Sequence, residues 1–460
     1  MGDGTADGRP VGGTEYSWCR AVEGGTGITV LALLLSRPAS RPLLDSALHQ
    51  LQSSHPLLRA HLVTAASRHP FFAIATTRSE VLRLLSSSDL LPPPPASASA
   101  VSVSPFDAIL EHEFNQNPWS DGGPTHPVLF ATLYEMPEPG RSTLALRLHT
   151  AVCDRTSAVA VLKELLALMA APGEGFHREA DGFNRGIDDL IPKQDAWKPF
   201  WARGKDLIGY SLNALRTSTL RFEDASSERR SQVARLVLGT DDTQKLLTAC
   251  KKRGIKLCGA LSAAAMVATR ASKQWENDHY ETYSVITLVD CRKYLDPPLH
   301  DHNIGFYHSA IINTHSIHEG EGLWEVAERC QCSYSTAIAN KKHLKDIGEV
   351  NYLMCRAIDH PHLTNSSSLR TALISVFEEP VVYESSAALQ HQLGVDDYVG
   401  CASAHGVGPS IAVFDTIRDG QLDCACVYPS PLHSRKQMQE LVEQMKSILR
   451  VDDDSEKSTK

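Results

Sequence analysis

The sequence lacks a hydrophobic run long enough to cross a membrane. Its most apolar stretch, Ile28 to Leu35, falls well short of the roughly 18–20 residues that a spanning helix needs. The N-terminus has no basic region followed by an apolar one, so no secretory signal is predicted. Ala6 also stands where a myristoylation site requires Ser or Thr. These absences predict a cytoplasmic protein without membrane association.

Positive charge is also scarce. The chain has 45 Lys and Arg against 54 Asp and Glu, a net charge of −9, and its basic residues form only short runs such as 251–253. A nucleic-acid-binding protein needs a basic surface, so that class is excluded. The 11 cysteines are odd in number and scattered, which is typical of free thiols in a reducing compartment.

Metal, nucleotide and hydrolase motifs are missing as well. The pairs Cys330/Cys332 and Cys424/Cys426 do not have the two-residue spacing of a zinc knuckle, so no metal is predicted. The glycines at 24–27 precede a strand and lack the third glycine of a dinucleotide fingerprint. The sequence contains neither a Gly-Lys-Ser/Thr phosphate loop nor a Gly-x-Ser-x-Gly elbow.

Helical and strand patterns alternate along the chain, which predicts a mixed α/β fold. Strands are expected at 28–36, 57–63, 71–76, 127–134, 143–148, 233–238, 283–289, 371–377, 398–402, 410–417 and 422–427. Helices are expected at 43–52, 106–114, 156–170, 240–253, 257–272, 323–343 and 435–449. Since similar patterns lie on both sides of a looser, partly charged stretch at 176–230, we predict an N-terminal lobe (1–180), a crossover linker (181–230), a C-terminal lobe (231–450) and a disordered tail (451–460). The proline-rich segment at 91–95 is expected to be a surface loop.

One segment combines residues suited to acid–base chemistry. Between Arg147 and Ser157 a strand ends at His149, and a helix begins after Asp154. A histidine at the end of a strand, facing a cleft, is well placed to accept a proton from a nucleophile. The simpler interpretation is that His149 is an ordinary strand-end residue and that Asp154 only caps the helix.

Two further segments complete a pattern. Arg292 opens an Arg-x-x-x-Leu-x-Pro-Pro-Leu stretch that is followed by Asn303-Ile304-Gly305, and Gly406 and Gly408 lie in a glycine-rich segment that runs into a strand. In their order and spacing, the three segments resemble the CoA-dependent acyltransferase superfamily. This superfamily includes plant BAHD acyltransferases, fungal alcohol acetyltransferases and the condensation domains of peptide synthetases. The resemblance covers nearly the whole chain.

The resemblance implies two chloramphenicol-acetyltransferase-like lobes that enclose a central tunnel, in a monomer without a bound cofactor. An acyl group would pass from acyl-CoA, the co-substrate, to a hydroxyl or amine of a small-molecule acceptor. The second histidine of the family's His-His-x-x-x-Asp-Gly motif is the base. Asp154 matches the acid, which is structural, and Arg292 matches its arginine partner on the other lobe.

This chain departs from the motif at its catalytic position. His149 matches the first histidine, Thr150 occupies the place of the catalytic one, and Arg155 replaces the glycine. Three interpretations follow. A bulge in the strand swings His149 into the cleft as the base; another histidine, His405 or His308, takes over; or the chain is a catalytically inactive protein of the same fold that binds an acyl-CoA, a small molecule or a protein.

Overall fold

The computed structural model describes residues 8–64, 69–75, 82–87, 103–171, 185–196, 198–273, 280–383 and 392–450. The proline-rich segment and the C-terminal tail lie outside these residues, as do 181–184 and 197 of the predicted crossover, whose remaining residues are described and contain two helices, Lys193–Ala196 and Phe200–Arg216. The chain divides into two compact units. The first comprises Met1–Pro192, Arg292–Tyr307 and Ser385–Ser403, and the second comprises Lys193–Cys291, His308–Glu384 and Ala404–Lys460. Two segments from the second half of the sequence therefore belong to the first unit.

The first unit contains a five-stranded sheet in the order β14-β2-β8-β7-β5 and a four-stranded sheet in the order β1-β4-β3-β6. Its strands are β1 (Gly8–Pro10), β2 (Thr26–Leu35), β3 (Ala60–Val63), β4 (Phe71–Ile74), β5 (Leu82–Ser86), β6 (Thr125–Pro127), β7 (Leu129–Glu135), β8 (Ser142–His149) and β14 (Val395–Ala404, which belongs to this unit up to Ser403). Its helices are α1 (Gly13–Glu23), α2 (Arg41–Ser54), α3 (Pro105–Phe114) and α4 (Arg155–Ala170), with short 3₁₀ helices η1 (Pro56–Arg59), η3 (Pro118–Ser120), η4 (Thr150–Val152), η5 (Ile187–Asp189) and η6 (Arg292–Tyr294).

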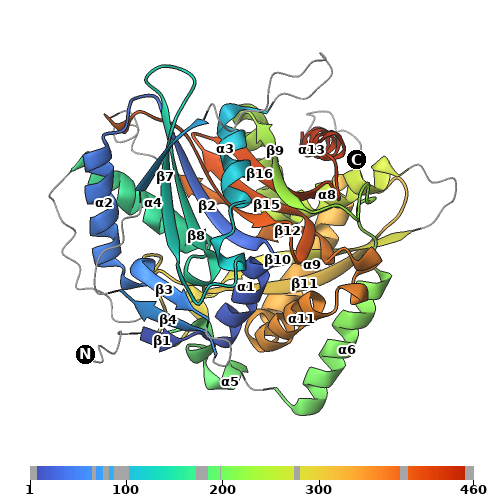
Figure 1. Ribbon diagram of the computed structural model, residues 1–460. Helices are drawn as coiled ribbons and strands as arrows, with labels where there is room; N and C mark the ends of the chain where they lie inside the picture. The colour runs from blue at the N-terminus through green and yellow to red at the C-terminus, as the bar shows by residue number, and fades with distance from the viewer. Residues whose placement is uncertain are drawn as a thin grey trace. The chain divides into compact units, whose positions relative to one another are not determined.

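The strand that leads to the candidate site is the most enclosed element of this unit. β8 lies between β2 and β7 and is antiparallel to both (Figure 1). Every residue of β8 is buried, and helix α3 packs against it and against β2. Its sequence, Ser-Thr-Leu-Ala-Leu-Arg-Leu-His, combines apolar side chains with buried polar ones, among them Arg147 and His149. The predicted strand at 143–148 and the predicted helix at 156–170 are confirmed, and both lie within β8 and α4.

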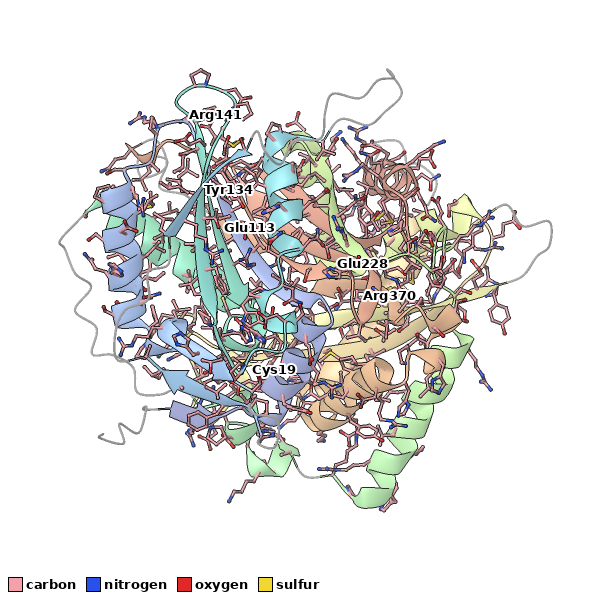
Figure 2. All side chains as sticks on the ribbon, viewed as in Figure 1. Cys19, Glu113, Tyr134, Arg141, Glu228 and Arg370 are labelled. Atoms are coloured by element: carbon pink, nitrogen blue, oxygen red, sulfur yellow. The ribbon has the colours of Figure 1, made fainter. Side chains whose placement is uncertain are left out.

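A buried polar network fixes β8 to α3. The carboxylate of Glu113, on α3, accepts a hydrogen bond of 2.5 Å from Arg147 Nη1 and another of 2.5 Å from the Tyr134 hydroxyl. Figure 2 labels Glu113 and Tyr134 on their neighbouring elements. A buried carboxylate is stable only with such partners. The network therefore holds the strand in one position relative to the helix.

Two predicted elements are wrong at their ends. The strand expected from Leu57 begins only at Ala60, because Pro56 starts the 3₁₀ helix η1. The helices expected over 323–343 are α9 (Leu323–Ala339) and α10 (Lys342–Lys345), and the second runs two residues past the predicted end. Lys341 has a left-handed backbone (φ 56°), which an α-helix does not accommodate.

The second unit is built on a seven-stranded sheet. Its order is β11-β10-β12-β15-β16-β9, and β13 also pairs with β15. The strands are β9 (Arg230–Leu238), β10 (Glu281–Asp290), β11 (His308–Ile317), β12 (Arg370–Phe377), β13 (Val381–Tyr383), β15 (Gly408–Arg418) and β16 (Gln421–Ser430). The helices are α5 (Lys193–Ala196), α6 (Phe200–Arg216), α7 (Thr240–Arg253), α8 (Leu257–Ser272), α9 (Leu323–Ala339), α10 (Lys342–Lys345), α11 (Ile347–Asp359) and α13 (Arg435–Leu449), with short 3₁₀ helices η7 (Pro361–Leu363) and η8 (Asn365–Ser367).

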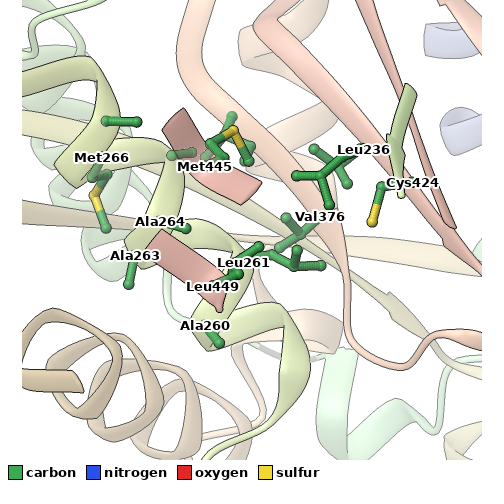
Figure 3. Close-up of a cluster of buried hydrophobic side chains, with 14 of the residues drawn as sticks. Leu236, Ala260, Leu261, Ala263, Ala264, Met266, Val376, Cys424, Met445 and Leu449 are labelled. Carbon is green, nitrogen blue, oxygen red and sulfur yellow. The ribbon is translucent and has the colours of Figure 1, made fainter. Parts of the chain in front are cut away.

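Helix α8 is the centre of the core of this unit. It packs against α9, α13 and strand β12, and five of its six alanines are fully buried. Ala260 and Ala264 are drawn in Figure 3 beside Met445 and Leu449 of α13. Small side chains allow helices to approach closely at native packing density. Among the described helices, none combines the length and the apolar character needed to cross a membrane.

Candidate functional site

Asp154 and Arg292 form the ion pair that the sequence predicts. Arg292 Nη1 donates to Asp154 Oδ2 at 2.9 Å, and Arg292 Nη2 donates to Oδ1 at 3.0 Å, so the pair is bidentate. The side chains are 3% and 1% exposed. Segment 292–307 belongs to the same compact unit as Asp154, so the expected placement of the arginine on the other lobe is corrected: the pair lies within the first unit.

Further hydrogen bonds connect this ion pair to the start of α4 and to segment 292–307. The pair together with Ser157 is called the lock below. Asp154 is the N-cap of α4 and accepts from the backbone N–H of Ser157 at 2.8 Å, while its other oxygen accepts from the N–H of Tyr307 at 2.8 Å. The Ser157 hydroxyl donates to the carbonyl of Gly305 at 2.9 Å. Gly305 is required here, because a Cβ at this position would lie 2.6 Å from the Tyr307 ring. Segment 292–307 is thereby held against the start of α4.

His149 is buried and has the environment of a structural residue. Its side chain is fully enclosed, and its ring lies edge-to-face against Trp119 with 5.0 Å between ring centroids. His149 Nδ1 accepts a hydrogen bond of 3.1 Å from the backbone N–H of Ala151, which caps η4. Burial lowers the pKa of His149 to about 3. The imidazole is therefore neutral at physiological pH.

The bulge that would turn His149 into a cleft is not present. The pairing between β2 and β8 runs without a register shift from Ile28↔His149 to Leu35↔Ser142. The hydrogen bond from Ala151 also fixes the tautomer. Because Nδ1 is the acceptor, the proton of the neutral ring lies on Nε2. A nitrogen that already carries a proton is not the acceptor that general-base catalysis requires.

We expect His149 to make the stability of the protein pH-dependent. Its folded-state pKa of about 3 is below the ordinary value of 6.5, so between these values the unfolded chain binds the proton first. The contribution is complete above about pH 6.5 and is lost progressively as the pH falls toward 3. Denaturant unfolding of the wild type and of His149→Phe between pH 7 and pH 5 measures it. Equal pH slopes in the two proteins would contradict the expectation.

Thr150, in the position of the motif's base, takes part in a hydroxyl–hydroxyl contact. Its Oγ1 lies 2.7 Å from Thr29 Oγ1 on β2, and both residues are buried. Gly27, whose φ is +92°, leaves room for this contact, because a Cβ there would lie 3.0 Å from the Trp18 ring and 3.2 Å from Thr150 Oγ1. Near neutral pH a threonine hydroxyl does not act as a base. It acts as a nucleophile only when an adjacent base or a metal ion activates it.

The two alternative histidines, His308 and His405, belong to the second unit. His308 begins β11, opposite Asp290 on β10, and lies edge-to-face on Phe377. His405 Nδ1 is 2.9 Å from the hydroxyl of Ser231. Burial, followed by the charge of nearby arginines, lowers the pKa of His405 to about 4. The first unit, which contains His149 and Thr150, includes neither of these histidines.

The glycine-rich segment forms the turn between β14 and β15. Gly408 has a φ of +155°, and its N–H donates to the carbonyl of Leu369 at 3.0 Å. The carbonyls on both sides of the turn, of Ala404 and Pro409, accept from Arg370 Nη1 at 3.0 and 2.5 Å. Arg370 was not singled out from the sequence, where it directly precedes the predicted strand 371–377 with no motif around it. Gly406, the other predicted glycine, is buried in the same turn.

The described parts of the chain contain no cluster of side chains suited to bind a metal ion. No group of three or more His, Cys, Asp or Glu side chains is positioned there to hold a metal ion. All 11 cysteines are free thiols, and most of them are buried. Burial raises the pKa of several of these thiols, Cys250 to about 11 and Cys330 to about 12, so they are poor nucleophiles.

The structure has the features that the resemblance implies: a mixed α/β fold in two units, and an acid–arginine lock at the start of a helix. The solved structures support this at the level of fold. Polyketide synthase associated protein 5 from Mycobacterium tuberculosis is 14% identical, with a TM-score of 0.64 over 96% of this chain and 98% of that chain. TRI3 trichothecene 15-O-acetyltransferase from Fusarium sporotrichioides is 14% identical, with a TM-score of 0.66 over 96% and 95%. The EpoB NRPS cyclization-docking bidomain from Sorangium cellulosum is 15% identical, with a TM-score of 0.69 over 97% and 85%.

A family match covers part of the chain. Residues 227–340 match the profile of the phthiocerol/phthiodiolone dimycocerosyl transferase C-terminus. No curated protein matches the sequence. The predicted resemblance is confirmed: the chain has the fold of the CoA-dependent acyltransferase superfamily, which includes condensation domains and acetyltransferases.

Proposed function

We propose that this chain binds an acyl thioester such as acyl-CoA in an acyltransferase fold without using a histidine as general base. The observation that carries the proposal is the pair of residues at the end of β8. Thr150 fills the motif's base position and contacts Thr29, and His149 is buried with its proton on Nε2. Neither side chain supplies the proton acceptor that activates an acceptor hydroxyl or amine.

The ligand class follows from what the site retains. The lock of Asp154, Arg292 and Ser157 is complete and buried, which keeps the scaffold around the end of β8 in place. The named relatives include an acetyltransferase and the C-terminal part of an acyl-transferring enzyme. These likenesses support an acyl donor as the ligand, while the altered motif argues against its turnover.

Calorimetry and a CoA-release assay on the purified full-length chain test the proposal together. We expect saturable binding of at least one member of a panel of short- and long-chain acyl-CoAs, and no release of free CoA with mixed alcohol and amine acceptors. His149→Ala should leave binding unchanged in a correctly folded protein. Rapid CoA release that His149→Ala reduces by about 10²–10⁴-fold, the usual share of a general base, would contradict it.

A second candidate is acyl transfer from a CoA thioester to a hydroxyl or amine of a small molecule, with His405 as the base. It is favoured by one observation: the His405 ring is only partly buried, and among the described residues its single hydrogen-bond partner is Ser231 through Nδ1. In that case CoA release is expected in the wild type, and His405→Ala should abolish it while His149→Ala has no effect.

A further inference from the structure

The second unit contains a buried arginine without a carboxylate partner. Arg370, labelled in Figure 2, is 3% exposed and begins strand β12. Its Nη1 and Nε groups donate to backbone carbonyls, whereas Nη2 has no hydrogen-bond partner among the described residues. Burial, followed by the charge of Arg229, lowers the pKa of Arg370 to about 9, so the guanidinium still carries its charge at neutral pH. A buried charge normally needs a counter-ion.

The surroundings of Arg370 add positive charge instead of neutralising it. Arg229 donates to the carbonyl of Ser368, beside Arg370, and Arg230 is exposed at the start of β9. Arg370, Arg229 and Arg230 all lie close enough to His405 to lower its pKa. In the described part of the chain, none of these three arginines forms an ion pair with a carboxylate. Such a concentration of cations is unexpected in a chain with a net charge of −9.

The nearest acids in the sequence do not compensate this charge. Both carboxylate oxygens of Asp224 accept hydrogen bonds from Ser226 and Ser227 in its own turn. Glu228 is exposed, and in the described part of the chain no ion pair joins it to Arg229, Arg230 or Arg370. His433 is fully buried nearby, and burial, followed by the charge of Arg370, lowers its pKa to about 4, so it adds no charge at neutral pH. The positive charge of the cluster is therefore carried by its arginines, of which Arg230 is exposed and Arg370 is buried.

We propose that Arg229, Arg230, His405 and the inner guanidinium of Arg370 form a binding site for a phosphate group. Guanidinium groups recognise phosphate through paired, charge-assisted hydrogen bonds, and the free N–H groups of Arg370 Nη2 are of this kind. Several cations without an acid match a doubly charged phosphate better than a singly charged carboxylate. Free phosphate and the phosphate ester of a larger ligand share this chemistry.

The identity of the molecule that carries the phosphate connects this site to the proposed function. The proposal that the site binds phosphate does not depend on the proposed function. If the chain binds acyl-CoA, one of the phosphates of CoA is the natural occupant, and only this assignment rests on the proposed function. Inorganic phosphate tests the site alone, and CoA compared with dephospho-CoA tests the source.

Isothermal titration calorimetry of the full-length chain with inorganic phosphate, CoA, dephospho-CoA and acetate provides the test. Arg229→Gln/Arg230→Gln should weaken phosphate binding at least about tenfold, since each lost charge-assisted hydrogen bond is worth roughly that factor or more. Arg216→Gln is the matched control, because Arg216 is an exposed arginine in the same unit and no ion pair involves it in the described structure. The control should bind phosphate like the wild type. The double variant keeps Arg370, so the buried contacts around the glycine-rich turn remain.

The outcomes separate the site from its ligand. Parallel loss of phosphate and CoA binding in the double variant supports the site with CoA as the source, and weaker binding of dephospho-CoA assigns the 3′-phosphate. Loss of phosphate binding alone supports the site and separates it from the acyl-CoA proposal. Absence of phosphate binding to the wild type, equal binding to the double variant, or equal binding of acetate would overturn the inference.

Discussion

Replacing Asp154 with alanine should destabilise the first unit by about 3–5 kcal/mol, which is the cost of leaving a buried charge without its partner. Arg292 would lose both hydrogen bonds to the carboxylate while remaining 3% exposed. Helix α4 would also lose its N-cap, and the N–H of Tyr307 its acceptor. The loss of stability should occur whether or not the protein has enzymatic activity. Denaturant unfolding, with near-UV circular dichroism to follow tertiary packing, measures it.

Asp396→Ala provides the matched control. Asp396 also pairs with an arginine in the first unit, Arg141 at 2.5 Å, but its side chain is 39% exposed. Exposed ion pairs contribute only about 0–1 kcal/mol. The double variant Asp154→Leu/Arg292→Met removes both charges and should lose less stability than the sum of the two single variants. A loss below 1 kcal/mol in Asp154→Ala would show that the pair does not hold segment 292–307 in place.

Thr150→His should create thioester turnover in a protein that otherwise only binds. The substitution places an imidazole, with an ordinary pKa near neutrality, at the motif's base position, whose scaffold is already intact. A positioned base contributes about 10²–10⁴-fold to such reactions. We therefore expect CoA release at that factor above the background hydrolysis measured with the wild type, followed by thiol titration with the acyl-CoA that binds most tightly.

The control for this variant is Thr150→Gln, which has a similar size and no basic nitrogen. Both variants lose the contact with Thr29, and both enlarge a side chain that is only 6% exposed, so a comparison between them isolates the base. Circular dichroism checks that both fold. If the two variants release CoA at the same rate, the missing histidine is not what separates this chain from its catalytic relatives.

Much of the fold is predictable from local patterns. The apolar residues Leu144, Leu146 and Leu148 of β8, the capping acid Asp154 and the helical spacing after it predict a strand, a turn and a helix in the correct places. The ends are less predictable where a proline or a left-handed residue, such as Pro56 or Lys341, changes the backbone. The ion pair of Asp154 with Arg292 was also predictable, but only through a resemblance, because the two residues are far apart in the sequence.

By itself, the sequence determined the α/β class, the resemblance to the acyltransferase superfamily and the absence of a histidine at position 150. Only the tertiary structure decided what His149 does, since its tautomer depends on the Ala151 N–H and its pKa on complete burial against Trp119. The same holds for Arg370. Its isolation from acids results from the pairing of β12 with β15 and from the glycine-rich turn, which bring backbone carbonyls to it in place of a carboxylate. Hydrogen-bond partners and burial depend on contacts between distant segments, and local patterns do not encode them.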